Sequence, residues 1–224
     1  MKPFTHANVT WLTHWLAVGG DLSPDPNKGA KQFAEIRDQF DVVIDTRVEA
    51  NDADLWAGVP TVQYVHLPTD DAVGHTIPAW VFHRAIDTVF GNPDIDTRWK
   101  DDDGHSDVSS PILVHCHMGI NRGPSVAMAL LLAAGWDPID AFELIRARRP
   151  VAAVYYAQDA LSAWHTYKAD YLGADTPDDL AYASRQWLDF DAHYDAVMTP
   201  EVMQQINHVI RTNHQRYYDE LQRS

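Results

Sequence analysis

The arrangement that most constrains the fold is a short apolar segment, a polar loop and a longer apolar stretch in direct succession. Residues 111–115 read Pro-Ile-Leu-Val-His, which is typical of a buried parallel strand. Residues 125–134 carry almost only apolar side chains, and a helix packed against a sheet is the element that buries so much surface. Gly135 is a residue type at which helices end. The succession therefore predicts an α/β fold with this strand inside the sheet.

Strands and helices are expected to alternate along most of the chain. The expected strands span residues 9–12, 15–18, 41–45 and 62–67, and the expected helices span residues 28–39, 51–57, 78–90, 137–148 and 155–168. This order predicts a central, mainly parallel sheet flanked by helices. From residue 170 the chain turns polar and acidic, and apolar residues return at helical spacing in 199–221. We therefore expect a first domain over residues 1–168 and a helical extension over residues 169–224, packed on or beside it.

The charge of the chain argues against two classes of partner. Its 17 Lys and Arg residues stand against 32 Asp and Glu residues, which gives a formal net charge of −15 at pH 7. Nucleic acids and anionic membranes repel such a protein at long range, so neither is expected as a partner. The single cysteine forms no internal disulfide, which fits a reducing compartment. No apolar run reaches the ~20 residues that a bilayer requires, and we expect a cytoplasmic protein.

The single cysteine lies in the loop between the predicted strand and the predicted apolar helix. This loop reads His115-Cys-His-Met-Gly-Ile-Asn-Arg122. A loop in this place directs successive backbone N–H groups inward, beside the positive end of a helix, and so binds an anion. The same field favours the thiolate form of Cys116, which is a nucleophile. Gly119 permits a conformation that a Cβ atom would block. Arg122 offers a planar fork for two phosphate oxygens.

This loop resembles the Cys-x5-Arg signature of the cysteine-dependent protein phosphatases, with His before Cys and Gly in mid-loop. Size and layout are most similar to the compact dual-specificity subgroup. The resemblance covers residues 9–168, including Trp15-Leu-Ala-Val-Gly19 and Val43-Ile-Asp-Thr-Arg47. It implies a dual-specificity phosphatase-like fold, with residues 1–168 as the catalytic domain. It also implies an enzyme without cofactor or metal, because the loop itself supplies the positive field.

The resemblance assigns roles to individual residues. Cys116 is the expected nucleophile, and Arg122 is expected to bind the phosphate. The rest of the expected phosphate-binding loop consists of His117, Met118, Gly119, Ile120 and Asn121. A general acid is needed on a separate loop to protonate the leaving oxygen. The segment Leu67-Pro-Thr-Asp-Asp71 places Asp71 at that position, with Asp70 as the second choice. His115 is expected either to support the loop through hydrogen bonds or to be a satisfied histidine at a strand end.

One residue departs from the family pattern. The family carries Ser or Thr directly after the arginine, where the hydroxyl bonds the cysteine sulfur and aids breakdown of the phosphoenzyme. This chain has Gly123 there. Ser125 follows two positions later and is expected to point about 200° further round the helix, which makes it a poor substitute. The resemblance therefore implies a slower second step and an active protein.

Two further groups are interpreted from local chemistry. A metal site at His115, Cys116 and His117 is disfavoured, because consecutive residues leaving a strand point in alternate directions. Arg148 and Arg149 stand at the end of a predicted helix, where cations are favoured in any case. We therefore interpret them first as cations that stabilise the end of this helix, with binding of acidic groups of a substrate as the second interpretation.

Three classes of function fit these residues. The first is a phosphatase of protein or peptide phosphotyrosine, with phosphoserine and phosphothreonine left open. The second is a phosphatase of a non-protein substrate. The Gly-x-Asn-Arg end of the loop favours RNA 5′-phosphates, which the negative charge opposes, and the absence of Lys from the loop opposes phosphoinositides. The third is a phosphopeptide-binding module with weak activity, in which Cys116 or Arg122 would be expected to be lost. We favour the first class.

Overall fold

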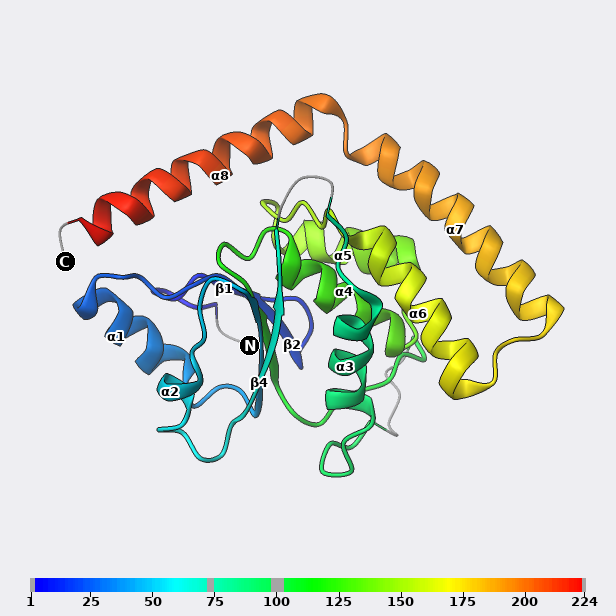
Figure 1. Ribbon diagram of the computed structural model, residues 1–224, viewed down its shortest axis with the longest axis horizontal. Coiled ribbons are helices and arrows are strands. Elements are labelled where there is room, and N and C mark those ends of the chain that lie inside the picture. Colours follow the sequence, from blue (N-terminus) through cyan, green and yellow to red (C-terminus); the bar gives the residue numbers. More distant parts are fainter. Residues whose placement is uncertain (1–2, 72–74, 98–102, 223–224) are drawn as a thin grey trace.

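The structure is a computed structural model and describes residues 3–71, 75–97 and 103–222 (Figure 1). Its centre is a five-stranded sheet of order β1-β2-β5-β3-β4. The strands are β1 (Val9–Trp11), β2 (Leu16–Gly19), β3 (Val42–Arg47), β4 (Gln63–Thr69) and β5 (Ile112–His115). The β1–β2 pair is antiparallel, and the three other pairs are parallel. The predicted mainly parallel sheet is confirmed, with β5 between β2 and β3.

Helices cover both faces of this sheet (Figure 1). They are α1 (Pro26–Ile36), α2 (Ala53–Trp56), α3 (Ala79–Phe90), α4 (Arg122–Ala133), α5 (Pro138–Arg148), α6 (Ala157–Leu172), α7 (Pro177–Val197) and α8 (Pro200–Leu221). Successive strand residues face opposite sides. Val43 and Leu113 thus pack with Ile36 and Trp56 of α1 and α2, in the smaller of two cores. The larger core lies on the other face and holds residues of α3, α4, α5 and α6.

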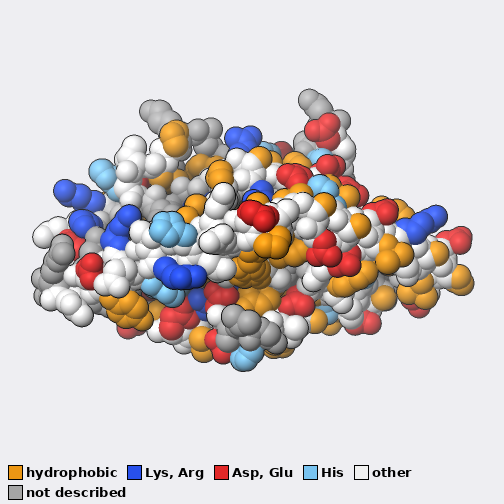
Figure 2. Space-filling view, turned by 90° about the horizontal axis from the view of Figure 1, so that it is seen from above, with side chains coloured by type: hydrophobic (Ala, Val, Ile, Leu, Met, Phe, Trp, Pro, Cys, Tyr) orange, Lys and Arg blue, Asp and Glu red, His pale blue; other side chains and the backbone are white. Residues whose placement is uncertain are grey.

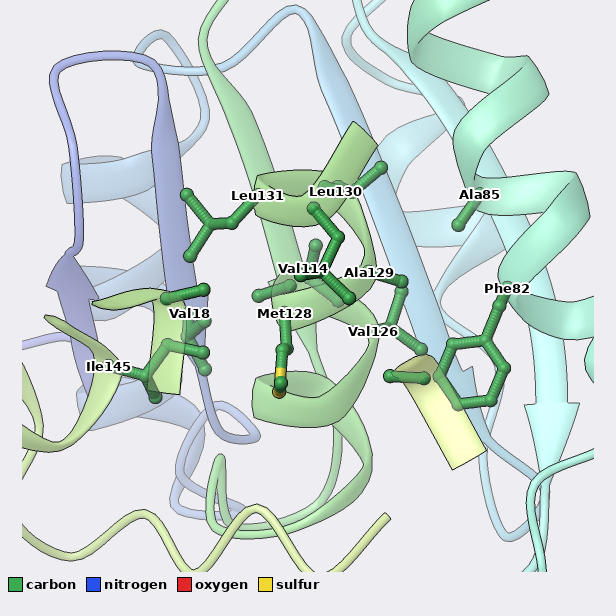
Figure 3. Close-up of a cluster of buried hydrophobic side chains, with 14 of the residues drawn as sticks. Val18, Phe82, Ala85, Val114, Val126, Met128, Ala129, Leu130, Leu131 and Ile145 are labelled. Atoms are coloured by element: carbon green, nitrogen blue, oxygen red, sulfur yellow. The ribbon is translucent and has the colours of Figure 1, made fainter. Parts of the chain in front are cut away.

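Helix α4 is the centre of the larger core. Every residue from Arg122 to Leu132 is buried, because the sheet covers one side of the helix and α3, α5 and α6 cover the others. Figure 3 shows Val126, Met128 and Leu131 of α4 packed among side chains from neighbouring strands and helices. Gly135 follows with φ +101°, a backbone conformation that ends the helix. The burial fixes the first turn of α4, and with it Arg122.

Helices α7 and α8 form the extension that the sequence predicts after the first domain. The preceding helix α6 runs to Leu172, past the boundary expected at residue 168, because Gly173 with φ +70° is the residue that caps it. Helix α7 packs on α5 and α6, and the Phe190 ring meets Phe142 edge-on at 5.8 Å. Helix α8 then turns back across the top of the sheet (Figure 1). Among the described helices, none combines the length and the apolar character needed to cross a membrane.

Candidate active site

The candidate site lies where the parallel strands end. Strands β2, β3, β4 and β5 have their carboxyl ends at one edge of the sheet. The loops that follow them carry Asp21, Glu49, Asp71 and Cys116, respectively. Ligands of open parallel sheets bind at this edge. All four residues line one cleft of about 1100 Å³, so the topology gathers residues that are far apart in the sequence.

The loop between β5 and α4 is folded around the sulfur of Cys116. The backbone N–H of Gly119 donates to Sγ at 3.2 Å. Gly119 has φ +65°, and a Cβ atom there would lie 2.7 Å from the carbonyl oxygen of Gly19. A side chain at this position would therefore force the loop away from β2. One backbone N–H of the loop thus points at the sulfur, and the binding of an anion by this loop stays a prediction.

Arg149 holds this loop from outside, which the sequence did not indicate. The side chain is buried rather than exposed, and its Nε donates to the carbonyl oxygen of Gly119 at 2.6 Å. Its Nη2 donates to the carbonyl oxygen of Met118 at 3.0 Å and to Asn8 at 2.8 Å, and Nη1 donates to Thr10 at 3.0 Å. The interpretation of Arg149 as a helix-end cation does not account for these contacts, which come from the loop after β5 and from residues in and just before β1. Two carbonyl groups of the loop are thereby fixed to a buried cation.

Arg122 begins α4 and is held by a carboxylate that the sequence analysis missed. Nη1 and Nη2 donate to the two carboxylate oxygens of Glu49 at 2.8 and 2.6 Å, and Nη1 also donates to the carbonyl oxygen of Thr69 at 2.9 Å. Partial burial raises the pKa of Glu49, but the hydrogen bonds from Arg122 outweigh it and lower this pKa to about 2. Within the described residues, the buried Nε of Arg122 has no hydrogen-bond partner. One edge of the guanidinium is thus anchored, while Nε remains for a ligand.

Asp71 lies beside these groups, and Asp70 is less closely connected to them. Oδ1 of Asp71 accepts from the Tyr156 hydroxyl at 3.0 Å and from Nδ2 of Asn121 at 3.3 Å. Its Oδ2 lies 3.5 Å from Nε of Arg122. The Asp71 side chain is 30% exposed, whereas that of Asp70 is 61% exposed and lies 3.5 Å from His75. Asp71 thus contacts Arg122 and Asn121 of the candidate site, and its role as the proton donor stays a prediction.

A buried charge network lies beneath the cleft. Arg47 donates from Nε and Nη2 to the fully buried Asp45 at 2.9 and 2.7 Å, and from Nη1 to Asp21 at 2.6 Å. The other oxygen of Asp21 lies 2.6 Å from Nδ1 of His117. Burial raises the pKa of Asp45, but the bonds from Arg47 prevail and lower it to about 2. The ionised network fixes the ring of His117 in the cleft wall.

His115 is buried beside the same charge network. Burial lowers the pKa of its imidazole, so the ring is neutral near pH 7. Its Nε2 has no hydrogen-bond partner among the described residues and lies 3.8 Å from Asp45. The backbone oxygen of His115 instead accepts from the Thr46 hydroxyl at 3.0 Å. A supporting role through hydrogen bonds of the ring therefore stays a prediction.

One cluster of described residues has the spacing of metal ligands. Donor atoms of Asp45, Asp52 and His115 lie within 4.8 Å of one another. Nη2 of Arg47 already occupies the space between the two carboxylates, at 2.7 Å from Asp45 and 2.6 Å from Asp52. The guanidinium supplies the positive charge that these carboxylates require, so the residues present do not fit an additional cation.

Comparisons with known proteins agree on the architecture. The chain matches no protein-family model and no curated protein. Among solved structures, Tk-PTP in its active form matches with a TM-score of 0.52 and 16% identity, over 70% of this chain and 95% of that chain. The mouse putative dual specificity phosphatase complexed with zinc tungstate matches with a TM-score of 0.52 and 15% identity, over 75% of this chain and 94% of that chain. PTPMT1 in complex with PI(5)P matches with a TM-score of 0.51 and 16% identity, over 72% of this chain and 99% of that chain. The fold is that of the dual-specificity and tyrosine phosphatases.

Within this phosphatase fold, the structure brings most predicted site residues together. The predicted residues that line the cleft are Asp70, Asp71, Cys116, His117, Met118, Ile120, Asn121 and Arg122. The other three predicted residues, Gly119, His115 and Ser125, are not among the residues that line the cleft. The sequence analysis missed Glu49 and did not predict the contact of Arg149 with the loop, because their partners are 73 and 30 positions away and no local pattern marks these contacts.

Gly123 has no side-chain hydroxyl to place beside the sulfur of Cys116. A Cβ atom at this position would lie 3.5 Å from Sγ of Cys116 and 3.4 Å from its backbone nitrogen. A serine side chain there would therefore stand beside the sulfur. The hydroxyl of Ser125 is engaged elsewhere, since it donates to the carbonyl oxygen of Asn121 at 2.8 Å and accepts from the N–H of Tyr156 at 3.3 Å. These contacts agree with the expectation that Ser125 does not replace the missing group.

Proposed function

We propose that this chain hydrolyses phosphomonoesters through a cysteinyl-phosphate intermediate, and that phosphotyrosine of a protein or peptide is the substrate. The observation that supports the proposal is the meeting of three groups in one cleft. These are a cysteine within a backbone anion cradle, the unpartnered Nε of Arg122 and the carboxyl group of Asp71. They have the types required for a nucleophile, an oxyanion stabiliser and a general acid.

In the first step, Sγ of Cys116 attacks phosphorus in line with the leaving phenolic oxygen. The S–P bond forms as the P–O bond breaks, and Asp71 gives its proton to the leaving oxygen. Nε of Arg122 and the N–H groups of the loop stabilise the equatorial oxygens. Arg149 fixes the loop before the substrate arrives, so little reorganisation is required in the transition state.

In the second step, water attacks the phosphocysteine and the S–P bond breaks. Asp71, now ionised, accepts the proton of the water, and inorganic phosphate leaves. The departing sulfur carries negative charge, which a hydrogen-bond donor would stabilise. Gly123 offers no side-chain donor there, so we expect this step to limit turnover.

The charge of the cleft favours a substrate with one phosphate on an uncharged body. The carboxylates that line it belong to Asp21, Glu49, Asp70, Asp71 and Asp159. Of the lining residues that the structure describes, Arg122 alone is Lys or Arg. A phosphoinositide or an RNA 5′ end would bring further phosphates against these carboxylates. Tyr155 and Tyr156 add aromatic surface suited to a phenyl ring, which favours phosphotyrosine over phosphoserine.

The test is a substrate panel with the purified protein. It comprises phosphotyrosine peptides, phosphoserine peptides, phosphoinositides and triphosphate-ended RNA, each assayed also with Cys116→Ser as the matched control. We expect the highest kcat/KM on phosphotyrosine, no turnover by Cys116→Ser, and no effect of a metal chelator. A higher kcat/KM on another substrate, full activity of Cys116→Ser, or inhibition by the chelator would each contradict the proposal.

A further inference from the structure

Helix α8 presents one of its faces to the active-site cleft. Five of its residues line the same cleft as Cys116, namely Met203, Asn207, Ile210, His214 and Tyr218. They are separated by three or four positions, which is the spacing of a single stripe along a helix. In Figure 1, α8 crosses above the ends of the strands. The cleft therefore has the phosphate loop as its floor and α8 as one wall.

The position of α8 is set by apolar contacts of its first half. Ile206 is buried, and Val202, Met203 and Ile210 pack against the larger core. Helix α7, from which α8 continues, is anchored by the buried Phe190. These contacts attach the helix to the catalytic domain on its cleft-facing side, so α8 is a fixed part of the cleft.

The second half of α8 reaches down to the phosphate loop. The rings of His214 and His117 have centroids 5.4 Å apart, with an angle of 32° between their planes. Asp21 orients His117, the residue directly after the nucleophile. Partial burial, and then the neighbouring His117, lower the pKa of His214, so it adds no cation for a second phosphate near pH 7. This contact closes the cleft on the α8 side, directly beside Cys116.

We infer that the inner face of α8 selects substrates by shape. It admits phosphotyrosine on a flexible, extended peptide and excludes the same group on the surface of a folded domain. The inference rests on the proposed phosphatase function. A helix with its side chains is about 10–12 Å across, and a folded surface as wide as a domain meets α8 before its phosphotyrosine reaches the loop. An extended peptide is narrow enough to enter between α8 and the opposite wall.

Residues on the two faces of α8 provide matched variants. His214 and Tyr218 line the cleft, and Tyr218 is 59% exposed at its rim, so His214→Ala with Tyr218→Ala opens the wall without touching the core. Thr212 and Arg216 lie on the opposite face of the helix by its 3.6-residue repeat and line a separate groove, and Thr212→Ala with Arg216→Ala is the control. Figure 2 looks onto this side of the molecule, with basic and histidine side chains over α8 on the left and acidic side chains over α7 on the right.

The experiment compares one phosphotyrosine sequence in an unstructured peptide and within a folded domain. For the natural chain we expect kcat/KM to be at least ~100-fold higher on the peptide than on the folded domain, because the folded domain is hindered in the transition state as well. Opening the wall should reduce this ratio about tenfold, chiefly by faster hydrolysis of the folded substrate. The control should leave both this ratio and the inhibition by tungstate, which binds at the loop, unchanged.

Two measurements separate this inference from the proposed function. The dissociation constants of both substrates on Cys116→Ser report shape selection without turnover. Equal constants there, or a ratio that the opened variant does not move, would overturn the role of α8. A preserved ratio of dissociation constants with no hydrolysis by the natural chain would overturn the proposed function alone. If the opened variant fails to fold, Asn207→Trp narrows the cleft instead, and unchanged peptide hydrolysis with this variant would equally refute the inference.

Discussion

The phosphate loop and helix α8 are the floor and one wall of the same cleft, but different forces hold them in place. Buried, charged hydrogen bonds fix the loop, from Arg149 to its carbonyl groups and from Arg122 to Glu49. Apolar packing of one half fixes α8, whose other half carries exposed side chains such as Tyr218. Buried charges tolerate few substitutions, because a lost partner leaves an unpaired charge. Exposed residues of the α8 wall tolerate many substitutions.

This contrast separates catalytic power from selectivity. Changes in the floor should alter how fast any phosphomonoester is hydrolysed, since they move groups that contact the phosphoryl oxygens. Changes in the wall should alter which phosphomonoesters reach those groups. The same cleft thus permits substrate preference to change without a change in the chemistry.

The largest expected effect is that of Arg122→Lys. Lysine keeps the charge but loses the planar fork that contacts Glu49 and leaves Nε for the phosphate. We expect kcat/KM on an aryl phosphate to fall by ~10³-fold, the upper range for loss of one oxyanion donor. Steady-state kinetics measure this, with Arg216→Lys on the outer side of α8 as the control. A fall below tenfold would mean that the guanidinium geometry is not needed.

Asp71→Asn is expected to have the next largest effect, and one that depends on the leaving group. Asparagine cannot protonate a departing oxygen, so hydrolysis of phenyl phosphate should slow by ~10²-fold or more. A substrate with a strongly acidic leaving group needs no proton and should be hardly affected. Asp70→Asn is the matched control. If Asp70→Asn shows this dependence on the leaving group instead, the general acid is Asp70.

Arg149→Met tests whether the floor depends on its outer support. The change removes a buried cation from the carbonyl groups of Gly119 and Met118. We expect a loss of about 3 kcal/mol in the free energy of unfolding, because buried carbonyl oxygens lose a charged donor, and a fall in kcat of ~10-fold. Urea denaturation and kinetics on the folded fraction measure the two effects. Arg148→Met changes the preceding residue, which makes none of these contacts. It should lower neither the free energy of unfolding nor kcat. Normal kcat in folded Arg149→Met would show that the loop keeps its shape unaided.

The smallest expected effect is a gain, in Gly123→Ser. The serine hydroxyl would stand beside Sγ and assist departure of the sulfur, so steady turnover should rise by about threefold, since one added neutral hydrogen bond contributes about 0.5–1.5 kcal/mol. The amplitude of the initial burst should change little. Rapid-mixing kinetics on an aryl phosphate decide this. A natural chain without a burst, together with no gain in the variant, would assign the task to another group, and Ser125→Ala would be examined first.

The central elements were predictable because their signals are local. The apolar pattern of residues 111–115 and 125–134 specifies a buried strand and helix by itself, and the spacing of Cys116 and Arg122 lies within one loop. The supports of that loop were not predictable, because Glu49 and Arg149 meet it only after the strands have aligned. Helix α8 shows the same limit. Its spacing predicts a helix, but the surface that an amphipathic helix covers is decided by tertiary packing.

The most direct test is to isolate the covalent intermediate on the natural protein. An aryl phosphate is mixed with the enzyme, the reaction is quenched in acid within the first turnover, and the digested protein is analysed by mass spectrometry. If Cys116 is the nucleophile and Gly123 slows breakdown, the peptide containing Cys116 should carry one phosphoryl group in most molecules. Cys116→Ser should carry none. Steady hydrolysis without phosphoryl on that peptide, or phosphoryl on another residue, would contradict the mechanism.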